Sequence, residues 1–251
     1  MRKRILLLTV TVLFITSIMF SGCAGGSKVG KLQLYANGED FVRQGFVSKD
    51  GWSISFDHVY ITLSDITAYQ TDPPYDPHDG GSINGEVTTA LDQTYTVDLA
   101  EGGPDALPIL VGEVPDAPVG QYNAISWNMV KAESGPAAGY SLVMIGTAEK
   151  DGQTVDFTIN IDAESSYDCG EYVGDERKGI LAEGSTADLE MTFHFDHIFG
   201  DAETPLDDEL NQGALGFEYF IDYADGTITE IDMGKMHLGH VGEGHCHCVC
   251  D

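Results

Sequence analysis

Hydrophobic and polar residues alternate with a period of two along most of the chain. The alternating runs are short, rich in Val, Ile, Thr, Tyr and Phe, and bounded by glycine, proline or acidic turn residues. This period predicts β-strands, and no stretch shows a sustained helical period. Short strands with frequent turns favour an all-β fold, an antiparallel β-sandwich of the Ig-like or Greek-key type, because a barrel would show more even spacing. The predicted strands cover residues 31–35, 52–63, 94–99, 122–130, 141–148, 154–161 and 187–195.

Turn residues separate the predicted strands, and the longest irregular stretches predict surface loops. The sequence EKDG at 149–152 lies between two strand-like runs, which is typical of a hairpin turn. Residues 71–85 and 165–179 are rich in glycine and acidic residues and predict long loops of the kind that carry function. Further along, the sequence predicts an acidic loop, a short helix over 207–215 and a last strand over 227–233.

The N-terminal residues have the order of a secretory signal. Basic residues at 2–4 precede an apolar run over 5–20, and Ser21 and Gly22 stand directly before Cys23. The run is too short and too rich in Thr and Ser for a comfortable membrane span. This order resembles the lipobox of bacterial lipoproteins, which implies that Cys23 is acylated and becomes the new N-terminus. A plain secretory signal is the alternative.

The lipobox resemblance, the strand pattern and the composition of the tail together divide the chain into four parts. Residues 1–22 are expected to be a lipoprotein signal peptide and 23–29 a short lipidated tether, followed by a β-sandwich domain over 30–235 and a His/Cys-rich tail over 236–251. Ala24 resembles the residue that follows the cysteine in lipoproteins sorted to an outer membrane. The expected location is therefore the cell envelope, with the chain anchored to a membrane and facing the periplasm or the exterior.

The chain is strongly acidic, with 41 Asp and Glu against 12 Lys and Arg and a formal net charge of −29. Such a field repels nucleic acid and anionic lipid headgroups and concentrates cations near the surface. Nucleic-acid binding is therefore excluded, and a solvated acidic surface explains the charge more simply than a dedicated calcium site. The acidic loop over 201–209 keeps calcium possible, although it lacks the alternation and the closing glutamate of an EF-hand.

The last fifteen residues, HLGHVGEGHCHCVCD, concentrate the side chains that bind borderline and soft metals. They hold four of the eight histidines and three of the five cysteines. We therefore predict a transition-metal site, copper first and zinc second, in which the glycines let the backbone wrap around the ion. If residues 245–250 are extended, their imidazoles and sulfurs point to opposite sides, so one ion does not take all of them. The candidate ligands are His237, His240, His245 and His247.

The cysteines leave two interpretations open. In the first, thiolates bind a soft ion such as copper(I). In the second, an oxidising envelope forms disulfides among the four cysteines that remain once Cys23 is acylated. We favour a disulfide from Cys169 to one tail cysteine, which would pin the tail to the body and leave the histidines as ligands. The candidate partners are Cys246, Cys248 and Cys250.

A second candidate cluster is formed by His194, Asp196 and His197. On a continuous strand His194 and Asp196 share one face, with His197 at the strand's end, while the hydrophobic residues between them face the core. A polar outer face is the alternative explanation. Because the tail supplies a second group of imidazoles, we predict that folding joins the two groups into one metal site. The remaining histidines are interpreted as a sheet-face residue, His58, and a loop residue, His78.

Three stretches of the body resemble extracytoplasmic β-sandwich lipoproteins. They are FDHVYITLSDI over 56–66, PVGQY over 118–122 and GTAEKDGQTVDF over 146–157. The resemblance spans 32–161 and includes uncharacterised envelope families and the copper-binding periplasmic proteins associated with methanobactin operons. It implies a sandwich fold and, in some of these families, copper binding. The resemblance assigns no ligand residue by residue in this chain.

Recognisable catalytic motifs are missing from the sequence. It contains no GxSxG, HExxH or phosphate loop, and too few cations to hold an anionic substrate. We therefore expect a lipid-anchored envelope protein that captures, stores or delivers copper or zinc and is not an enzyme. An acidic interaction module that recognises a protein or a glycan is the alternative, followed by a metal-dependent hydrolase built on His194, Asp196 and the tail histidines.

Overall fold

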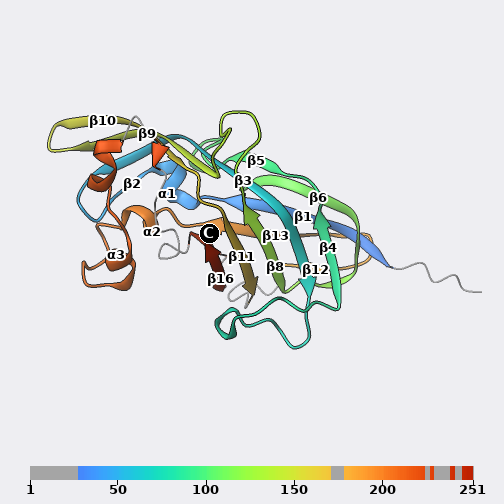
Figure 1. Ribbon diagram of the computed structural model, residues 1–251. Helices are drawn as coiled ribbons and strands as arrows, with labels where there is room; N and C mark the ends of the chain where they lie inside the picture. The colour runs from blue at the N-terminus through green and yellow to red at the C-terminus, as the bar shows by residue number, and fades with distance from the viewer. Residues whose placement is uncertain (1–27, 171–177, 224–226, 229–237, 241–244, 251) are drawn as a thin grey trace, which may run out of the picture.

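The computed structural model describes residues 28–170, 178–223, 227–228, 238–240 and 245–250. Two open β-sheets face each other and enclose one main hydrophobic core, so the predicted all-β sandwich is confirmed (Figure 1). Helices α2 (Asp196–Phe199) and α3 (Glu209–Gly213) lie at the end of the molecule that also holds the hairpin over 142–161, whereas η1 (Pro77–Asp79) packs against the last strand, over 245–250.

The smaller sheet has four strands in the order β15-β13-β1-β6. Along β1, half-buried and buried residues alternate, with Leu32, Leu34 and Ala36 facing the core. Such alternation is the pattern of a strand with one face on the core and one toward solvent. The bounds are Val29–Asn37 for β1, Ile109–Pro118 for β6, Thr186–Phe193 for β13 and Gly239–His240 for β15.

The larger sheet has ten strands and is centred on β3, an 18-residue strand that pairs with β8 and β9 and with the short strands β2, β4 and β5. Its main order is β14-β10-β9-β3-β8-β11-β16. The predicted hairpin turn is confirmed, because Gln153 of β10 pairs with Lys150 of β9. The bounds are Phe46–Val47 for β2, Ser53–Gln70 for β3, Val87–Leu91 for β4, Tyr95–Asp98 for β5, Ala124–Met129 for β8, Leu142–Lys150 for β9, Gln153–Ile161 for β10, Ser165–Gly170 for β11, Thr227–Ile228 for β14 and His245–Cys250 for β16.

Short elements connect the strands of the two sheets. A further two-stranded sheet pairs β7 (Gly120–Gln121) with β12 (Ile180–Leu181). None of the helices in the described part of the chain has the length and apolar character needed to cross a membrane. The helical elements are α1 (Glu39–Gln44), η1 (Pro77–Asp79), α2 (Asp196–Phe199), α3 (Glu209–Gly213) and η2 (Glu218–Tyr223), and α3 lies within the predicted helix.

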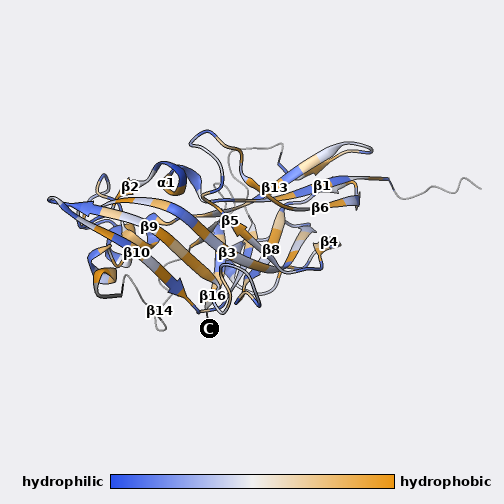
Figure 2. Ribbon diagram, turned by 90° about the horizontal axis from the view of Figure 1, so that it is seen from above, coloured by the Kyte–Doolittle hydropathy of each residue, from blue (hydrophilic) through white to orange (hydrophobic). Residues whose placement is uncertain are grey.

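The core forms where the inner faces of the two sheets meet. Trp127 of β8 contacts Phe193 of β13 in the opposite sheet, with ring centroids 6.0 Å apart, and stacks on Tyr167 of β11. All three rings are buried. Because aromatic rings bury large apolar areas, these contacts tie the two sheets together near the end of β13. Figure 2 shows hydrophobic and hydrophilic residues alternating along strands such as β9 and β10.

The structure corrects three expectations about the strands. The sandwich is not purely antiparallel, since β1 pairs in parallel with β13, and β10 pairs in parallel with β14. The alternation of hydrophobic and polar residues indicates which face of a strand is buried, but it does not indicate the direction of the neighbouring strand. The first part of the loop expected over 165–179 is strand β11, which pairs with β8 and β16. The strand expected to continue to residue 195 ends at Phe193, because the chain turns there and begins α2.

The C-terminal tail belongs to both sheets. β15 pairs with β13 in the smaller sheet, and β16 pairs with β11 at the edge of the larger one. The described parts of the tail, which was expected to begin at residue 236, thus share backbone hydrogen bonds with strands of the body. Cys23 and the signal-like segment before it lie outside the described residues, as does His237.

Candidate metal centre

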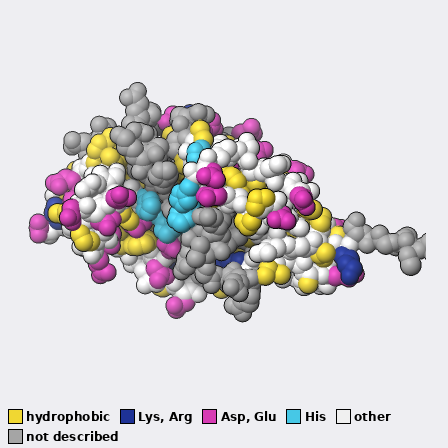
Figure 3. Space-filling view, turned by 90° about the horizontal axis from the view of Figure 1, so that it is seen from below, with side chains coloured by type: hydrophobic (Ala, Val, Ile, Leu, Met, Phe, Trp, Pro, Cys, Tyr) yellow, Lys and Arg dark blue, Asp and Glu magenta, His cyan; other side chains and the backbone are white. Residues whose placement is uncertain are grey.

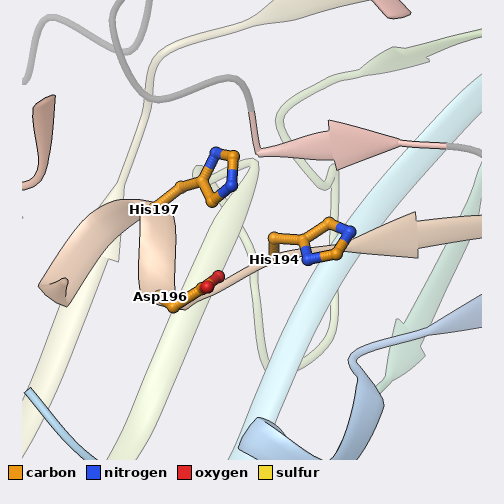
Figure 4. A group of neighbouring side chains, drawn as sticks. All are labelled: His194, Asp196 and His197. Atoms are coloured by element: carbon orange, nitrogen blue, oxygen red, sulfur yellow. The ribbon is translucent and has the colours of Figure 1, made fainter. Parts of the chain in front are cut away.

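Three of the predicted ligands, His194, Asp196 and His197, come together at the end of β13. Their ligand atoms lie within 4.8 Å of one another. Figure 4 shows the three side chains around a common space, with His194 in the turn after β13 and the other two residues in the first turn of α2. The predicted cluster is thus present, but it is formed by a turn between a strand and a helix. The sequence had predicted that alternation along a continuous strand would form it.

Buried hydrophobic side chains hold this turn in place. Phe195, Ile198 and Phe199 are fully buried, so they anchor the turn from the core side. Gly200 ends α2 with a φ of 69°, a left-handed conformation that glycine adopts at little cost. Its N–H donates a hydrogen bond to the carbonyl oxygen of Asp196 at 2.6 Å. The interleaving of hydrophobic and polar residues therefore keeps the polar side chains together on the other side of the turn.

Asp196 is the most informative member of the cluster. The residue is only 8% exposed, and its Oδ1 atom is buried with no hydrogen-bond partner. Burial raises the pKa of its carboxyl group above 3.8, and the imidazole of His197 and the backbone N–H groups of His197 and Asp196 only partly oppose this. A buried carboxylate oxygen without a partner costs free energy that a bound cation would recover.

Glu39, the first residue of α1, adds a second carboxylate to the cluster. Its Oε2 atom lies 3.2 Å from Nδ1 of His194. Burial, followed by the negative charges of Asp196 and Glu190, raises the pKa of Glu39 from 4.5 to about 6. No motif in the sequence marks this residue, because β1 and β13 must pair before the two segments become neighbours.

The backbone of Glu39 is held in an unusual conformation. Its φ of 55° lies in the left-handed region, where a non-glycine residue costs roughly 1–2 kcal/mol. The N–H of Glu39 donates a hydrogen bond to the side-chain oxygen of Asn37 at 2.9 Å, which stabilises this turn between β1 and α1. Strained residues of this kind are found most often at functional sites. The conformation is consistent with a carboxylate that must point at His194.

The donor set of this cluster suits a borderline divalent metal. Two imidazoles with one or two carboxylates are ligands of zinc, copper(II) and iron(II). The side chain of His194 is 22% exposed and that of Glu39 is 36% exposed, so the cluster can be reached from solvent. We refer to His194, Asp196, His197 and Glu39 below as the His194 site.

The alternation predicted for the end of the tail is confirmed. Cys246 and Cys248 pack against the core, whereas His245 is exposed and His247 is half-buried. On the face shown in Figure 3, histidine side chains gather near the middle, beside acidic side chains. Within the described residues, however, neither tail histidine joins a group of three ligand atoms within 4.8 Å. The structure therefore brings neither His245 nor His247 into the group of His194, Asp196 and His197, and a single site that joins these three to other tail histidines stays a prediction.

The remaining tail histidine with a described backbone, His240, lies near the end of β13. It pairs with Thr192 in the register of β15 and β13. The carbonyl oxygen of Leu238 accepts a hydrogen bond from the N–H of His194 at 2.9 Å. The tail backbone thus borders the His194 site.

The predicted disulfide is confirmed. Cys169 of β11 is bonded to Cys246 of β16, which lies directly opposite in the register of the two strands. Two of the sulfurs that a copper(I) thiolate site would use are therefore already paired with each other. The side chain of the last tail cysteine, Cys250, lies outside the described atoms.

The acidic loop over 201–209 uses several carboxylates for local contacts. Asp201 accepts hydrogen bonds from the N–H of Glu203 at 3.1 Å and from the hydroxyl of Thr204 at 3.1 Å. Asp208 caps α3 by accepting from the N–H of Leu210 at 3.0 Å. These contacts give the aspartates a structural role in turns and caps, and calcium binding there stays a prediction.

No protein-family model, curated protein or solved structure matches the chain. The resemblance to envelope lipoproteins therefore stays a prediction from the sequence. The functional proposal below depends on the geometry of this chain alone.

Glu39→Gln should remove a pH dependence from the stability of the metal-free protein. Folding raises the pKa of Glu39 from 4.5 to about 6, so the folded state binds a proton on this carboxyl group more tightly than the unfolded state does. As pH rises through the window from about 4.5 to about 6 the group loses its proton, and its charged form destabilises the fold. Above this window, the variant should be more stable by about 1 kcal/mol or less, because the side chain is 36% exposed and solvent screens its charge. Urea denaturation at both ends of the window measures this. Glu86→Gln, at an exposed position, is the control, and a Glu39→Gln effect that is equal at both ends would contradict the account.

Proposed function

We propose that the protein binds a divalent transition metal ion, zinc or copper(II), at the His194 site. His194, Asp196 and His197 would be the main ligands, with Glu39 as a fourth. The observation that carries the proposal is the buried Oδ1 atom of Asp196, which has no hydrogen-bond partner and lies beside two imidazoles. A divalent ion would satisfy this oxygen and relieve the repulsion between the two carboxylates.

The donor types favour a borderline divalent ion over copper(I). Copper(I) prefers thiolate and thioether ligands, whereas imidazole and carboxylate suit zinc and copper(II). Cys169 and Cys246 are bonded to each other, so they offer no thiolate. Copper(II) binds such sites more tightly than zinc in the general order of affinities, and the supply of each ion decides which one is held.

Capture, storage or delivery of the ion is the role that these features support. The His194 site is partly exposed, so an ion can enter and leave without a large rearrangement. The net charge of −29 concentrates cations near the surface and speeds their capture. Binding without catalysis also agrees with a sequence that carries no recognised catalytic motif.

Zinc titration of the metal-free protein against a chromophoric chelator tests the proposal. His197→Ala removes one main ligand and should cost the protein the zinc equivalent bound at the His194 site, because loss of even an outer-shell partner weakens metal sites by roughly 10–100-fold. The matched control is His58→Ala, since His58 is an exposed histidine of β3 whose Nδ1 atom lies 2.7 Å from Asp98. Wild-type zinc binding in His197→Ala would refute the proposal.

A lipid anchor at Cys23 would place this metal site in the cell envelope. The support is the order of basic residues, apolar run and small residues before the cysteine. Cys23→Ser should therefore move the protein from membranes to soluble fractions, as cell fractionation would show. A variant that is processed normally and still sediments with membranes would contradict the anchor and leave the metal proposal intact.

A further inference from the structure

A second group of histidines lies on the outer side of β16. The imidazole rings of His78, in η1, and His245, in β16, lie with their centroids 4.7 Å apart. The next outward residue of β16 is His247, which pairs with Asp168 of β11. The sequence predicted His78 to be a simple loop residue, so this contact joins two segments that no motif connects.

The disulfide sets the position of these tail histidines. Cys246 is bonded to Cys169 directly across the two strands. Because side chains alternate along a strand, the cysteine on the core side places His245 and His247 on the outer side. Within the described residues β16 is an edge strand that pairs with β11 alone, so the covalent bond secures its register.

The loop that carries His78 is held against the same edge. Gly170, at the end of β11, has no side chain, and a Cβ atom there would collide with the carbonyl oxygen of Tyr75. Asp76 caps η1 by accepting a hydrogen bond from the N–H of His78 at 2.8 Å. The contact between His78 and His245 therefore joins a fixed loop to a fixed strand.

The charges around this group favour a cation. Asp168 is half-buried and lies directly opposite His247 in the register of β11 and β16, where side chains on one face are neighbours. The two side chains are thus close enough to interact. In metal sites a carboxylate commonly accepts a hydrogen bond from one ring nitrogen of a ligating histidine, which orients the other nitrogen toward the ion.

We propose that His78, His245 and His247 form a second site for a divalent transition metal ion, with Asp168 orienting His247. Imidazole nitrogens bind zinc at about 2.0–2.1 Å, so two of them on one ion lie within about 4 Å of each other. Rings whose centroids are 4.7 Å apart meet this condition after small side-chain rotations. The ligand atoms of His78, His245 and His247 are not all within 4.8 Å of one another in the structure, so binding an ion would draw the side chains together. His245 and His247 lie two residues apart on one strand face, roughly 7 Å from Cα to Cα, a spacing that two imidazole side chains can bridge through one ion.

This second site shares no ligand with the His194 site, and the inference does not rest on the function proposed above. Zinc chloride is the probe, added to the metal-free protein with its disulfide intact, and bound zinc is counted by elemental analysis after desalting. Wild-type protein is expected to bind two equivalents, and His245→Ala and His194→Ala are each expected to bind one. His78→Phe keeps an aromatic ring in place and should also lose one equivalent, whereas the control His58→Ala should keep both.

Two results would overturn the inference. Wild-type zinc content in both His245→Ala and His78→Phe would mean that the rings only pack against each other. A single wild-type equivalent that is lost in His245→Ala and in His194→Ala alike would mean that the two groups form one shared site. A single equivalent that His245→Ala removes and His194→Ala leaves in place would support the second site and refute the His194 proposal.

Discussion

Asp196→Asn is expected to abolish tight metal binding at the His194 site while making the metal-free protein more stable. The wild-type carboxylate is buried with one oxygen that has no hydrogen-bond partner, and burial raises its pKa. Asparagine keeps the shape and removes the charge, so the free energy of unfolding should rise by about 1–3 kcal/mol. Without the carboxylate, zinc affinity at this site should fall by roughly 100-fold or more, since outer-shell changes alone cost up to that much.

The gain in stability should depend on pH in a defined direction. Because the pKa of Asp196 is raised in the folded state, its charged form destabilises the fold, and this cost is present at neutral pH and disappears as acid protonates the group. The difference between variant and wild type should therefore shrink toward low pH, as chemical denaturation of the metal-free proteins would show. Asp57→Asn, at an exposed position of β3, is the matched control. A variant that is less stable than wild type at neutral pH without metal would contradict this account of Asp196.

Removing the disulfide is expected to cost stability and the second zinc site together. Cys169→Ser combined with Cys246→Ser opens a cross-link between residues 77 positions apart, and such bonds contribute roughly 2–4 kcal/mol. β16 would then be held only by its hydrogen bonds to β11, so His245 and His247 would lose their fixed positions. The His194 site should survive, because its main ligands lie within one turn of the chain.

Thermal denaturation and zinc counting on the same samples measure both effects. Val249→Ser changes a residue of the same strand that is 54% exposed and outside the disulfide, so it should retain both zinc equivalents and nearly all of the stability. Loss of neither equivalent in the double serine variant would show that the disulfide does not position the second site. Loss of both equivalents would show that the two sites depend on each other.

The alternation of residues predicted much of the fold and part of the chemistry. The inward cysteines and outward histidines of β16 follow from the period of two in a strand, and the same rule predicted most of the core strands. The disulfide between Cys169 and Cys246 was predicted from cysteine number and compartment, although its exact partner required the register of β11 and β16. These features depend on the local order of residues or on the number of cysteines, so they can be predicted from the sequence.

Other features depend on contacts between distant segments and could not be predicted. Glu39 joins the His194 site only because β1 and β13 pair in parallel, and His78 meets His245 only because Gly170 admits the backbone of a loop. The turn at the end of β13 was also missed, since residues 191–199 carry hydrophobic residues that fit a strand for five positions and a helical turn thereafter. In each of these three cases, tertiary packing decides the structure and the local sequence pattern does not.

Diffraction from zinc-loaded crystals at the zinc absorption edge tests the central claim most directly. The account predicts an anomalous peak about 2.0–2.2 Å from a nitrogen of His194, a nitrogen of His197 and the Oδ1 oxygen of Asp196, the usual distances for zinc ligands. The absence of a peak at this position, with the Oδ1 atom of Asp196 still buried and without a ligand, would contradict it, whether or not zinc is bound near His78 and His245.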